Sequence, residues 1–144
     1  MINLETTEKF INSELTTKIN NSFIKHSELK LFTDVNDLVE VILFLKNNSK
    51  TKFRQLIDIT AVDYPEKEKR FKMIYLLLSH ENNQRIKIEF EIKENDMVNS
   101  ITSIYPAANW MEREVFDMYG ISFKDHPDLR RILTDYGFKG HPLR

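Results

Sequence analysis

The sequence has 144 residues, close to the usual size of one domain. Its 21 Lys and Arg oppose 22 Asp and Glu, and a net charge of -1 argues against general binding to nucleic acid or anionic lipid, which needs a positive field. The chain has no cysteine, which excludes disulfides, iron–sulfur ligation, thiolate zinc sites and cysteine nucleophiles.

The chain shows no sign of a membrane span or a targeting segment. Its longest apolar run, Met73 to Leu78, is far shorter than the stretch of about 18 residues that a membrane helix needs. Residues Met1 to Phe10 carry Glu5 and Glu8 and no Arg, so they resemble neither a secretory signal nor an Arg-rich transit peptide. We therefore expect a protein that is kept in a reducing compartment or is encoded inside an organelle.

The first part of the chain predicts two helices with a strand between them. Apolar residues recur at helical spacing from Leu4 to Ile19, which predicts an amphipathic helix. Glu28 to Phe32 is a short strand candidate. Asp34 to Lys46 predicts a second helix, with Asp34 as its cap and a single apolar face.

Three strands are predicted next, and a fourth is possible. Phe53 to Val62 is apolar and β-branched, and Arg70 to Ser79 is apolar enough for a central strand. Arg85 to Lys93 alternates apolar and charged residues with a period of two, which indicates one buried face. His80 to Gln84 forms the expected hairpin loop, and Val98 to Tyr105 is the candidate fourth strand.

The segregation of these elements predicts an α+β fold rather than a doubly wound sheet. We expect a two-layer sandwich, with two helices packed on a mixed or antiparallel sheet of about four strands. All three glycines and three of the four prolines follow Tyr105. The chain therefore divides into an α+β body, residues 1–105, and a helix with an irregular tail, residues 106–144, within one domain.

A short helix is predicted at the start of the second segment. Asn109 and Glu112 have the spacing of a capping box, and Gly120 suits the left-handed position at a helix C-terminus. Glu114 and Asp117 have the spacing of a carboxylate pair for acid–base chemistry. A docking helix with a charged outer face is the favoured interpretation.

The tail contains two histidines, His126 and His141, close in sequence to several aspartates. A metal site would need three or four convergent ligands, and the spacing matches no familiar pattern. The run from His126 to Asp128 reads more simply as a helix start, with Pro127 at the first helical position. We favour that structural interpretation over a metal centre.

The segment after Pro106 is charge-balanced and rich in aromatic residues, and it includes the basic pair Arg130 and Arg131. Aromatic residues together with Arg are the usual anchors of protein interfaces. The residues therefore favour a surface that binds another protein, without identifying that protein.

The last third of the chain resembles the signature of a known family, the 30 kDa subunit of the NADH–quinone oxidoreductases of respiratory complex I. The resemblance is carried by the lead-in Pro106 to Trp110, the run Glu112 to Ile121, His126–Pro127, Leu129 to Leu133, Asp135 to Phe138 and Gly140 to Arg144. Family members usually continue past this last motif with an extended tail that wraps the partner, whereas this sequence stops at Arg144.

The resemblance implies a non-catalytic subunit of the hydrophilic arm of a proton-translocating NADH:quinone oxidoreductase, docked on the large quinone-site subunit. It implies no cofactor in this chain, with FMN and iron–sulfur clusters in other subunits. It implies a peripheral position on the cytoplasmic face of a bacterial inner membrane, or on the matrix side of the mitochondrial one. The positions carried over for structure or partner binding, none of them catalytic, are Trp110, Glu112, Arg113, Glu114, Asp117, Tyr119, His126, Arg130, Arg131, Asp135, Tyr136 and His141.

Two alternatives stay open. One is the homologous subunit of a related hydrogenase-type or photosynthetic NAD(P)H dehydrogenase complex. The other, less favoured, is a free-standing hydrolase that uses His126 or His141 with nearby aspartates.

Overall fold

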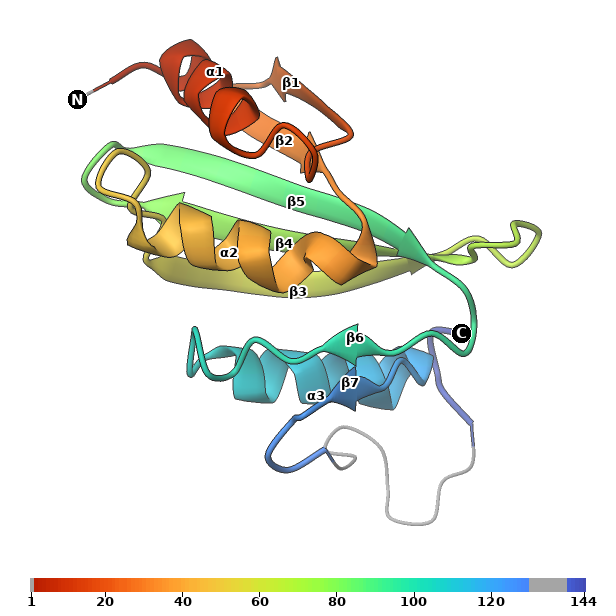
Figure 1. Ribbon diagram of the computed structural model, residues 1–144. Helices are drawn as coiled ribbons and strands as arrows, with labels where there is room; N and C mark the ends of the chain where they lie inside the picture. Colours follow the sequence, from red (N-terminus) through yellow and green to blue (C-terminus); the bar gives the residue numbers. More distant parts are fainter. Residues whose placement is uncertain (1, 130–139) are drawn as a thin grey trace.

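A five-stranded sheet forms the centre of the protein (Figure 1). The computed structural model describes residues 2–129 and 140–144. All neighbouring strands are antiparallel except β2 and β5, which are parallel. In spatial order the strands are β1 (Asn21–Lys25), β2 (Glu28–Phe32), β5 (Gln84–Ile92), β4 (Phe71–Ser79) and β3 (Gln55–Asp63).

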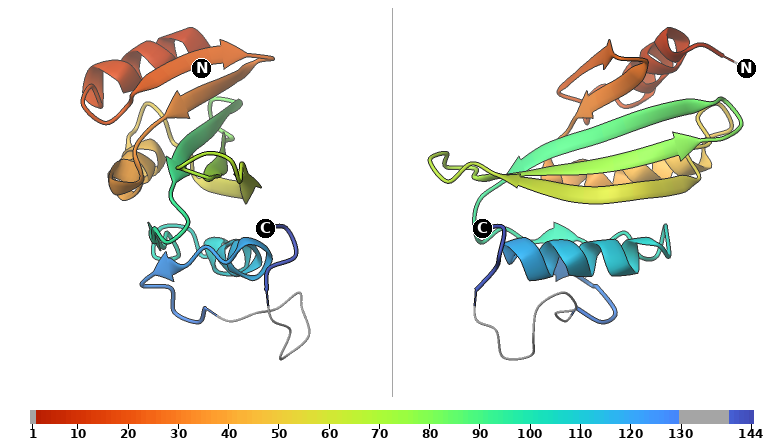
Figure 2. Two further views of the ribbon diagram at one scale, coloured as in Figure 1. Left: turned by 90° about the vertical axis from the view of Figure 1, so that its right-hand side faces the viewer. Right: turned by 180° about the vertical axis from the view of Figure 1, so that it is seen from behind.

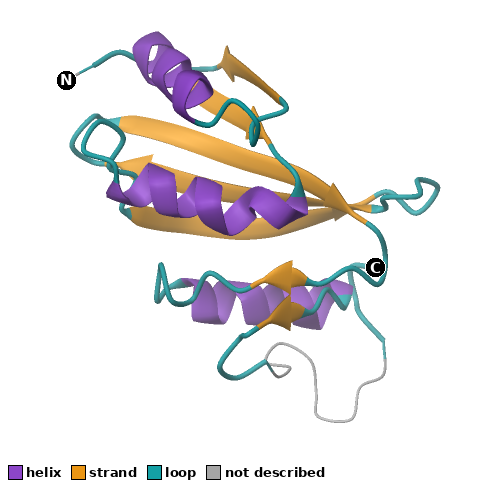
Figure 3. Cartoon of the chain, viewed as in Figure 1, coloured by secondary structure: helices purple, strands orange, loops and turns teal. Residues whose placement is uncertain are grey.

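Two helices, α1 (Leu4–Glu14) and α2 (Leu38–Asn47), lie on one side of this sheet (Figure 3). Helix α1 lies beside the β1–β2 hairpin, and α2 follows a 3-10 turn at Val35–Asp37. Seen from behind in Figure 2, strands β3, β4 and β5 lie in front of α2, with no helix over their near face. Helix α3 (Ala108–Tyr119) runs alongside β3, at the edge of the sheet.

The core explains why β4 and β5 form where they do. In β4 the odd-numbered residues Phe71, Met73, Tyr75 and Leu77 are buried, while the residues between them are half-buried. The register places Tyr75 opposite Ile88 of β5, so that one apolar face is continuous across both strands. Four residues of α2 at helical spacing pack into the same core, namely Leu38, Val41, Ile42 and Leu45.

The α+β class and the helices and strands expected before residue 93 are confirmed, with one strand added. The added strand, β1, pairs with β2 through a tight turn in which His26 and Ser27 have positive φ values of 53° and 60°. Its side chains are exposed or half-buried, so the segment carries no clear apolar period. The sheet therefore has five strands rather than about four.

The expected strand from Val98 to Tyr105 is wrong. Only β6 (Val98–Asn99) is extended, and it pairs in parallel with β7 (Phe123–Lys124) rather than joining the main sheet. The chain then turns, and Tyr105 donates a backbone bond of 2.9 Å to the carbonyl of Ile101. Both side chains are still buried, which is why a strand-like apolar pattern appears in a turn.

The expected cap of the second helix is also wrong. The Asp34 side chain makes no capping bond and instead accepts a hydrogen bond of 3.2 Å from the Asn20 side chain. The chain enters α2 through the 3-10 turn, and α2 likewise begins without a side-chain cap. The first helix ends at Glu14, before the predicted Ile19, and it is capped by the Asn3 side chain, which accepts from the Thr6 N–H at 2.8 Å.

An ion pair at the β3–β4 turn gives a testable acid dependence. Arg70 donates from Nε and Nη2 to the two carboxylate oxygens of Asp63, each at 2.8 Å. These hydrogen bonds lower the pKa of Asp63 from its ordinary value of 3.8. The stability that Asp63 contributes is therefore present above pH 3.8 and is lost as the pH falls through the lower folded-state pKa.

We expect wild type to be more stable than Asp63→Asn at pH 6, and we expect that advantage to shrink below pH 3.8. Urea unfolding of both proteins from pH 6 to pH 2.5 measures the difference. If wild type stays more stable than Asp63→Asn by the same amount over this range, the lowered pKa of Asp63 is contradicted. Asp125→Asn, at an exposed carboxylate, is the matched control.

Candidate partner-binding site

Helix α3 presents different chemistry on its different sides. Ala108, Glu112 and Val115 recur at helical spacing and are buried. Trp110 and Met118, on another side, flank Glu114 at intervals of four residues. On this side Trp110 is 51% exposed, whereas Glu114 and Met118 are half-buried. The helix is therefore anchored by one side while the other stays available.

Glu112 is a buried anchor. Its Oε1 accepts a hydrogen bond of 2.6 Å from the Ser100 hydroxyl, and its Oε2 accepts one of 2.8 Å from the Ile101 backbone N–H. His126 Nε2 lies 3.9 Å from Oε1. Burial raises the pKa of Glu112, and the bonds from Ser100 and Ile101 oppose that shift. Glu112 thus ties α3 to the segment after β6.

This anchoring role replaces the predicted capping box. Helix α3 begins after Ala107, and no side chain caps it. The Glu112 carboxylate is directed to Ser100 and Ile101 instead of turning back to the backbone of Asn109. The prediction at the other end of the helix is confirmed, because Gly120 has a positive φ of 76° at the C-cap.

The two tail histidines bond to opposite ends of α3. His126, whose side chain is fully buried, contacts the Asn109 carbonyl through Nε2 at 3.0 Å and accepts from the Asp128 N–H at Nδ1. His141 contacts the Asp117 carbonyl through Nδ1 at 3.0 Å. Carbonyls eight residues apart are about 12 Å apart along a helix. Each histidine therefore fastens a different end of the helix.

This separation argues against one metal site that would use both histidines. No group of three or more metal-ligating side chains comes together within residues 2–129 and 140–144. The predicted helix start at His126 is not found in the described part of the tail, where Pro127 and Asp128 form a turn before residue 130.

Glu114 and Asp117, the less favoured carboxylate pair of the sequence analysis, have different surroundings. Glu114 Oε1 accepts a hydrogen bond of 2.8 Å from Trp110 Nε1, whereas the Asp117 side chain is fully buried. The guanidinium carbon of Arg113 lies 5.6 Å from the centre of the Trp110 ring. Trp110 is therefore held by two side chains of its own helix while half of its surface faces solvent.

The chain end packs beside the C-terminus of α3, a contact that the sequence did not predict. Leu143 donates its N–H to the Met118 carbonyl at 2.9 Å. Arg144 Nη2 donates to Glu94 Oε1 at 2.8 Å, and its guanidinium lies 5.5 Å from the Phe71 ring centre. The Tyr119 ring meets Phe71 edge-on at 6.2 Å, and burial raises the pKa of the Tyr119 hydroxyl. The only sequence signal for this contact is that Leu143 and Arg144 end the last signature motif.

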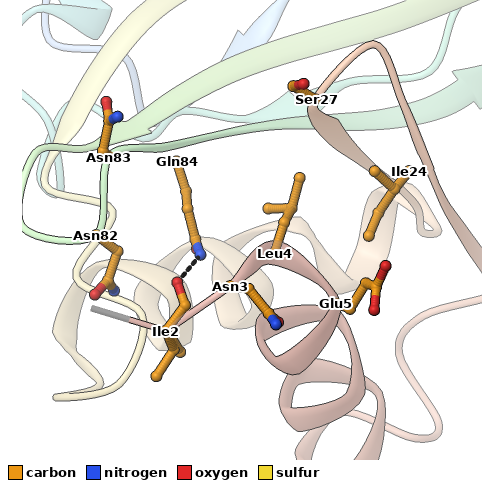
Figure 4. A pocket seen from close by; sticks show the side chains of 9 residues that line it. All are labelled: Ile2, Asn3, Leu4, Glu5, Ile24, Ser27, Asn82, Asn83 and Gln84. Carbon is orange, nitrogen blue, oxygen red and sulfur yellow. Dashed lines mark hydrogen bonds between the residues drawn. The ribbon is translucent and has the colours of Figure 1, made fainter.

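Two hollows on the surface have different linings. A groove of about 330 Å³ lies between β3 and α3 and is lined by Ile59, Thr60, Ala61, Glu114, Val115, Met118, Tyr119 and Leu143. A pocket of about 450 Å³ lies at the start of α1, where the Gln84 side chain donates to the Ile2 carbonyl at 2.9 Å (Figure 4). Glu5 is the only ionisable side chain in its lining. The groove, and not the pocket, contains predicted site residues.

Four predicted site residues, Arg130, Arg131, Asp135 and Tyr136, lie outside the described residues. Of the others, Glu112 and His126 come together in one buried cluster. Trp110, Arg113 and Glu114 form a second group, in which Trp110 is exposed and the other two residues are half-buried.

Gly120→Ala tests the packing of His141 on α3. A Cβ at this position would lie 2.7 Å from two atoms of the His141 ring, and the backbone would be strained at a φ of 76°. We expect a loss of about 1–2 kcal/mol from the backbone conformation alone, with a further loss from the displaced ring. Urea unfolding measures the total.

Two further variants separate the cost of the clash between this Cβ and the His141 ring from the cost of the backbone conformation. In a His141→Ala background, Gly120→Ala should cost less than in the wild type. Gly140 also has a positive φ, of 106°, but a Cβ added there would meet nothing within 4 Å. Gly140→Ala therefore serves as the control without a steric clash. Equal costs of Gly120→Ala in both backgrounds would show that His141 does not pack there in solution.

Comparison with known proteins identifies the family. The family model described as the respiratory-chain NADH dehydrogenase 30 Kd subunit matches residues 31–144. The chain belongs to this family. The resemblance seen in the sequence is therefore confirmed.

Curated relatives agree with this assignment, and all three described here are named as the same subunit of NADH-quinone oxidoreductase. The protein of Ruegeria pomeroyi is 55% identical over 121 residues, which cover 84% of this chain and 60% of that protein. The Dinoroseobacter shibae protein is 56% identical, with 84% of this chain and 56% of that protein covered. The Chelativorans protein is 45% identical over 94% of this chain and 68% of its own length. The chain thus spans roughly three-fifths of these relatives.

A solved structure shares the fold. A chain of the membrane-bound sulfane sulfur reductase, an archaeal respiratory membrane complex, superimposes with a TM-score of 0.78 over 91% of this chain and 77% of its own. The two sequences are 23% identical, so the likeness shows the fold alone. In the part of this chain that the structure describes, no helix has the length and apolar character to cross a bilayer.

Proposed function

We propose that this chain is a non-catalytic subunit of the hydrophilic arm of a proton-translocating NADH:quinone oxidoreductase, and that it docks on the large quinone-site subunit. Membership of the 30 Kd subunit family supports the assignment. The observation that carries the docking role is Trp110, exposed and held in place by Arg113 and Glu114. An aromatic side chain fixed beside an Arg is the usual composition of an interface anchor.

The proposed role leaves electron transfer to other subunits. Iron–sulfur clusters are bound through cysteine thiolates, and this sequence has no cysteine. Flavin and clusters would then lie in neighbouring subunits, and this chain would position a partner rather than carry electrons. We place the subunit at the membrane surface, on the cytoplasmic side in a bacterium or the matrix side in a mitochondrion.

Purification of the assembled complex tests this function. The full chain, tagged in the organism that encodes it, is isolated in mild detergent and run on a native gel stained for NADH oxidation with quinone as acceptor. We expect the tagged chain to run with the stained band and to co-purify with flavin- and cluster-containing subunits. A chain that runs alone, or with a complex that oxidises hydrogen but not NADH, would contradict the proposal.

A further inference from the structure

The face of the central sheet that points away from α2 carries the even-numbered residues of β4, and we call it the open face. Its row along β4 is aliphatic and half-buried, namely Ile74, Leu76 and Leu78. In the part of the chain that the structure describes, no helix lies over β3, β4 and β5 on this face (Figure 2). Strands covered on both faces have continuous apolar runs, as Met73 to Leu78 does. The sequence of β4 thus indicates a second cover for this strand.

Charges of both signs lie beside this aliphatic row. On the open face Ile74 lies opposite Glu89 of β5, and Leu76 lies opposite Lys87. Lys87 in turn lies beside Lys30 of β2. A uniformly anionic surface, such as a membrane or a nucleic acid, does not complement a face of mixed charge, whereas a folded protein surface can. The open face therefore fits a protein partner.

Glu89 is buried on this face without a partner for its carboxylate. The residue is only 7% exposed. Its side chain has no hydrogen bond or ion pair among the residues that the structure describes. Desolvation of a carboxylate costs free energy unless a cation or hydrogen-bond donors compensate it. Glu89 therefore favours pairing with a cationic group.

Glu89 lines a hollow of about 220 Å³ that is large enough to admit such a group. The lining contains four other ionisable side chains, namely Asp34, Lys69, Lys72 and Glu91. Glu91 already accepts a hydrogen bond of 2.8 Å from Lys67. The ammonium group of Lys72 lies 5.9 Å from the centre of the Tyr64 ring. Glu89 is therefore the carboxylate in this hollow that a cation from outside can pair with.

The cation that fits is a side chain rather than a metal ion. A metal ion needs several converging ligands, and no group of three or more His, Cys, Asp or Glu side chains in the described residues could hold one. A single carboxylate beside an aliphatic row instead suits a Lys or Arg side chain, whose aliphatic stem packs on apolar surface while its charged end pairs.

We propose that the open face docks on a neighbouring subunit, which inserts one Lys or Arg side chain into the hollow to pair with Glu89. Aliphatic side chains of the same subunit cover Ile74, Leu76 and Leu78 and supply the second cover for β4. The inference rests on the proposed subunit role. It adds a docking surface on the sheet to the one that contains Trp110 on α3.

Glu89→Gln tests the pairing, because stability and association should respond differently. In the isolated chain the carboxylate is unpaired, so a neutral amide of the same shape should leave the free energy of unfolding unchanged or raise it. In the complex the same substitution removes an ion pair, so association should weaken by about tenfold or more and depend less on salt. A residue with a merely structural role would lower stability first.

Three further variants and two controls complete this test. Glu89→Lys places like charges together, so it should weaken association more than Glu89→Gln does. Leu76→Gln should weaken association by about tenfold or more by placing an amide in the aliphatic row. Glu14→Gln and Glu14→Lys, at an exposed residue of α1, and Leu43→Gln, at an exposed residue of α2, are the matched controls and should associate like the wild type. Association is followed as the yield of assembled complex at increasing chain concentration, in low and high salt.

Hydroxyl-radical footprinting of the wild type tests the open face without any substitution. The oxidation of Phe32, which lines the hollow, and of Leu76 is compared between the free full chain and the purified assembled complex. We expect both to be oxidised slower by about fivefold or more in the complex, because residues at the core of an interface are desolvated. Should a variant fail to fold by circular dichroism, this measurement still decides the question.

Each other result would overturn the inference. Lower stability of isolated Glu89→Gln would show that Lys69 or Lys72 already pairs with Glu89. Oxidation at equal rates in the free chain and the complex, or association of Glu89→Gln like the wild type, would show that no partner uses this face. Protection that rises with the concentration of the free chain would identify a second copy, and protection by anionic lipid vesicles would identify a membrane. In all these cases co-purification of the wild-type chain with the complex would still support the subunit role.

Discussion

Glu112→Ala is expected to destabilise the protein by about 2–4 kcal/mol, because it deletes a fully buried acceptor and leaves a cavity. The Ile101 N–H, now paired at 2.8 Å, would be left buried without a partner. The Ser100 hydroxyl loses its 2.6 Å bond but lies 2.9 Å from the Thr102 hydroxyl, to which it can turn. Most of the loss therefore comes from Ile101 and from the empty volume.

Glu112→Gln separates geometry from charge. A glutamine amide has nearly the same shape, and it can accept from the Ile101 N–H while donating to the Ser100 oxygen. We therefore expect a much smaller loss than for alanine. Urea unfolding of both variants at pH 7 gives the comparison, with Glu114→Ala as a control on the same helix. Equal losses for Ala and Gln would show that the hydrogen bonds to Glu112 are not what stabilises this segment.

The Gln variant also predicts a pH dependence. Burial raises the folded-state pKa of Glu112 above 4.5, its ordinary value. A carboxyl group whose pKa is raised on folding contributes stability that is fully present below pH 4.5. That stability is lost as the pH rises through the folded-state pKa. The stability of wild type relative to Glu112→Gln should therefore decline as the pH rises above 4.5. A difference in stability between the two proteins that does not change as the pH rises above 4.5 would contradict the raised pKa of Glu112.

Local patterns in the sequence are sufficient to locate the central strands. The alternation along Arg85 to Lys93 predicts β5 within one residue, because one face of this strand is buried. The alternation fails at β1, where neither face is well buried. It misleads at Ile101 and Tyr105, because a tight turn buries the same residues that a strand would.

The candidate site was predictable as a set of residues but not as a geometry. Gly120 was placed correctly because a helix C-terminus requires a left-handed residue whatever surrounds it. Glu112 was misassigned because its partners, Ser100 and Ile101, come from a segment whose own structure the sequence does not reveal. The groove beside β3 depends on strand order and on the path of residues 140–144, and both are tertiary properties.

Two groups of residues from the signature motifs therefore have different roles. Glu112 and His126 are buried and hold α3 in place, so their substitution should first reduce the stability of the isolated chain. Trp110 and Glu114 hydrogen-bond to each other within α3, and Trp110 is 51% exposed, so their substitution should leave folding largely intact. Stability and assembly, measured side by side, separate the two groups.

Trp110→Ala is expected to weaken association with the partner subunit by about 2–4 kcal/mol, or about 30- to 1000-fold, which is the range of an interface anchor. The large effect follows from two features. The ring is 51% exposed, so a partner can bury much of it. The ring is also held by the 2.8 Å bond to Glu114 and by Arg113, so little side-chain entropy is lost on binding.

Leu43→Ala is the matched control for this measurement. Leu43 is 40% exposed on α2, no residue of which lines the groove, and its truncation should change association by less than about 0.5 kcal/mol. Trp110→Phe keeps an aromatic ring but loses the bond to Glu114, so its effect should be intermediate. Association is followed as the yield of assembled complex at increasing chain concentration, with urea unfolding of each isolated variant. If Trp110→Ala folds and assembles like Leu43→Ala, this side of α3 does not bind the partner.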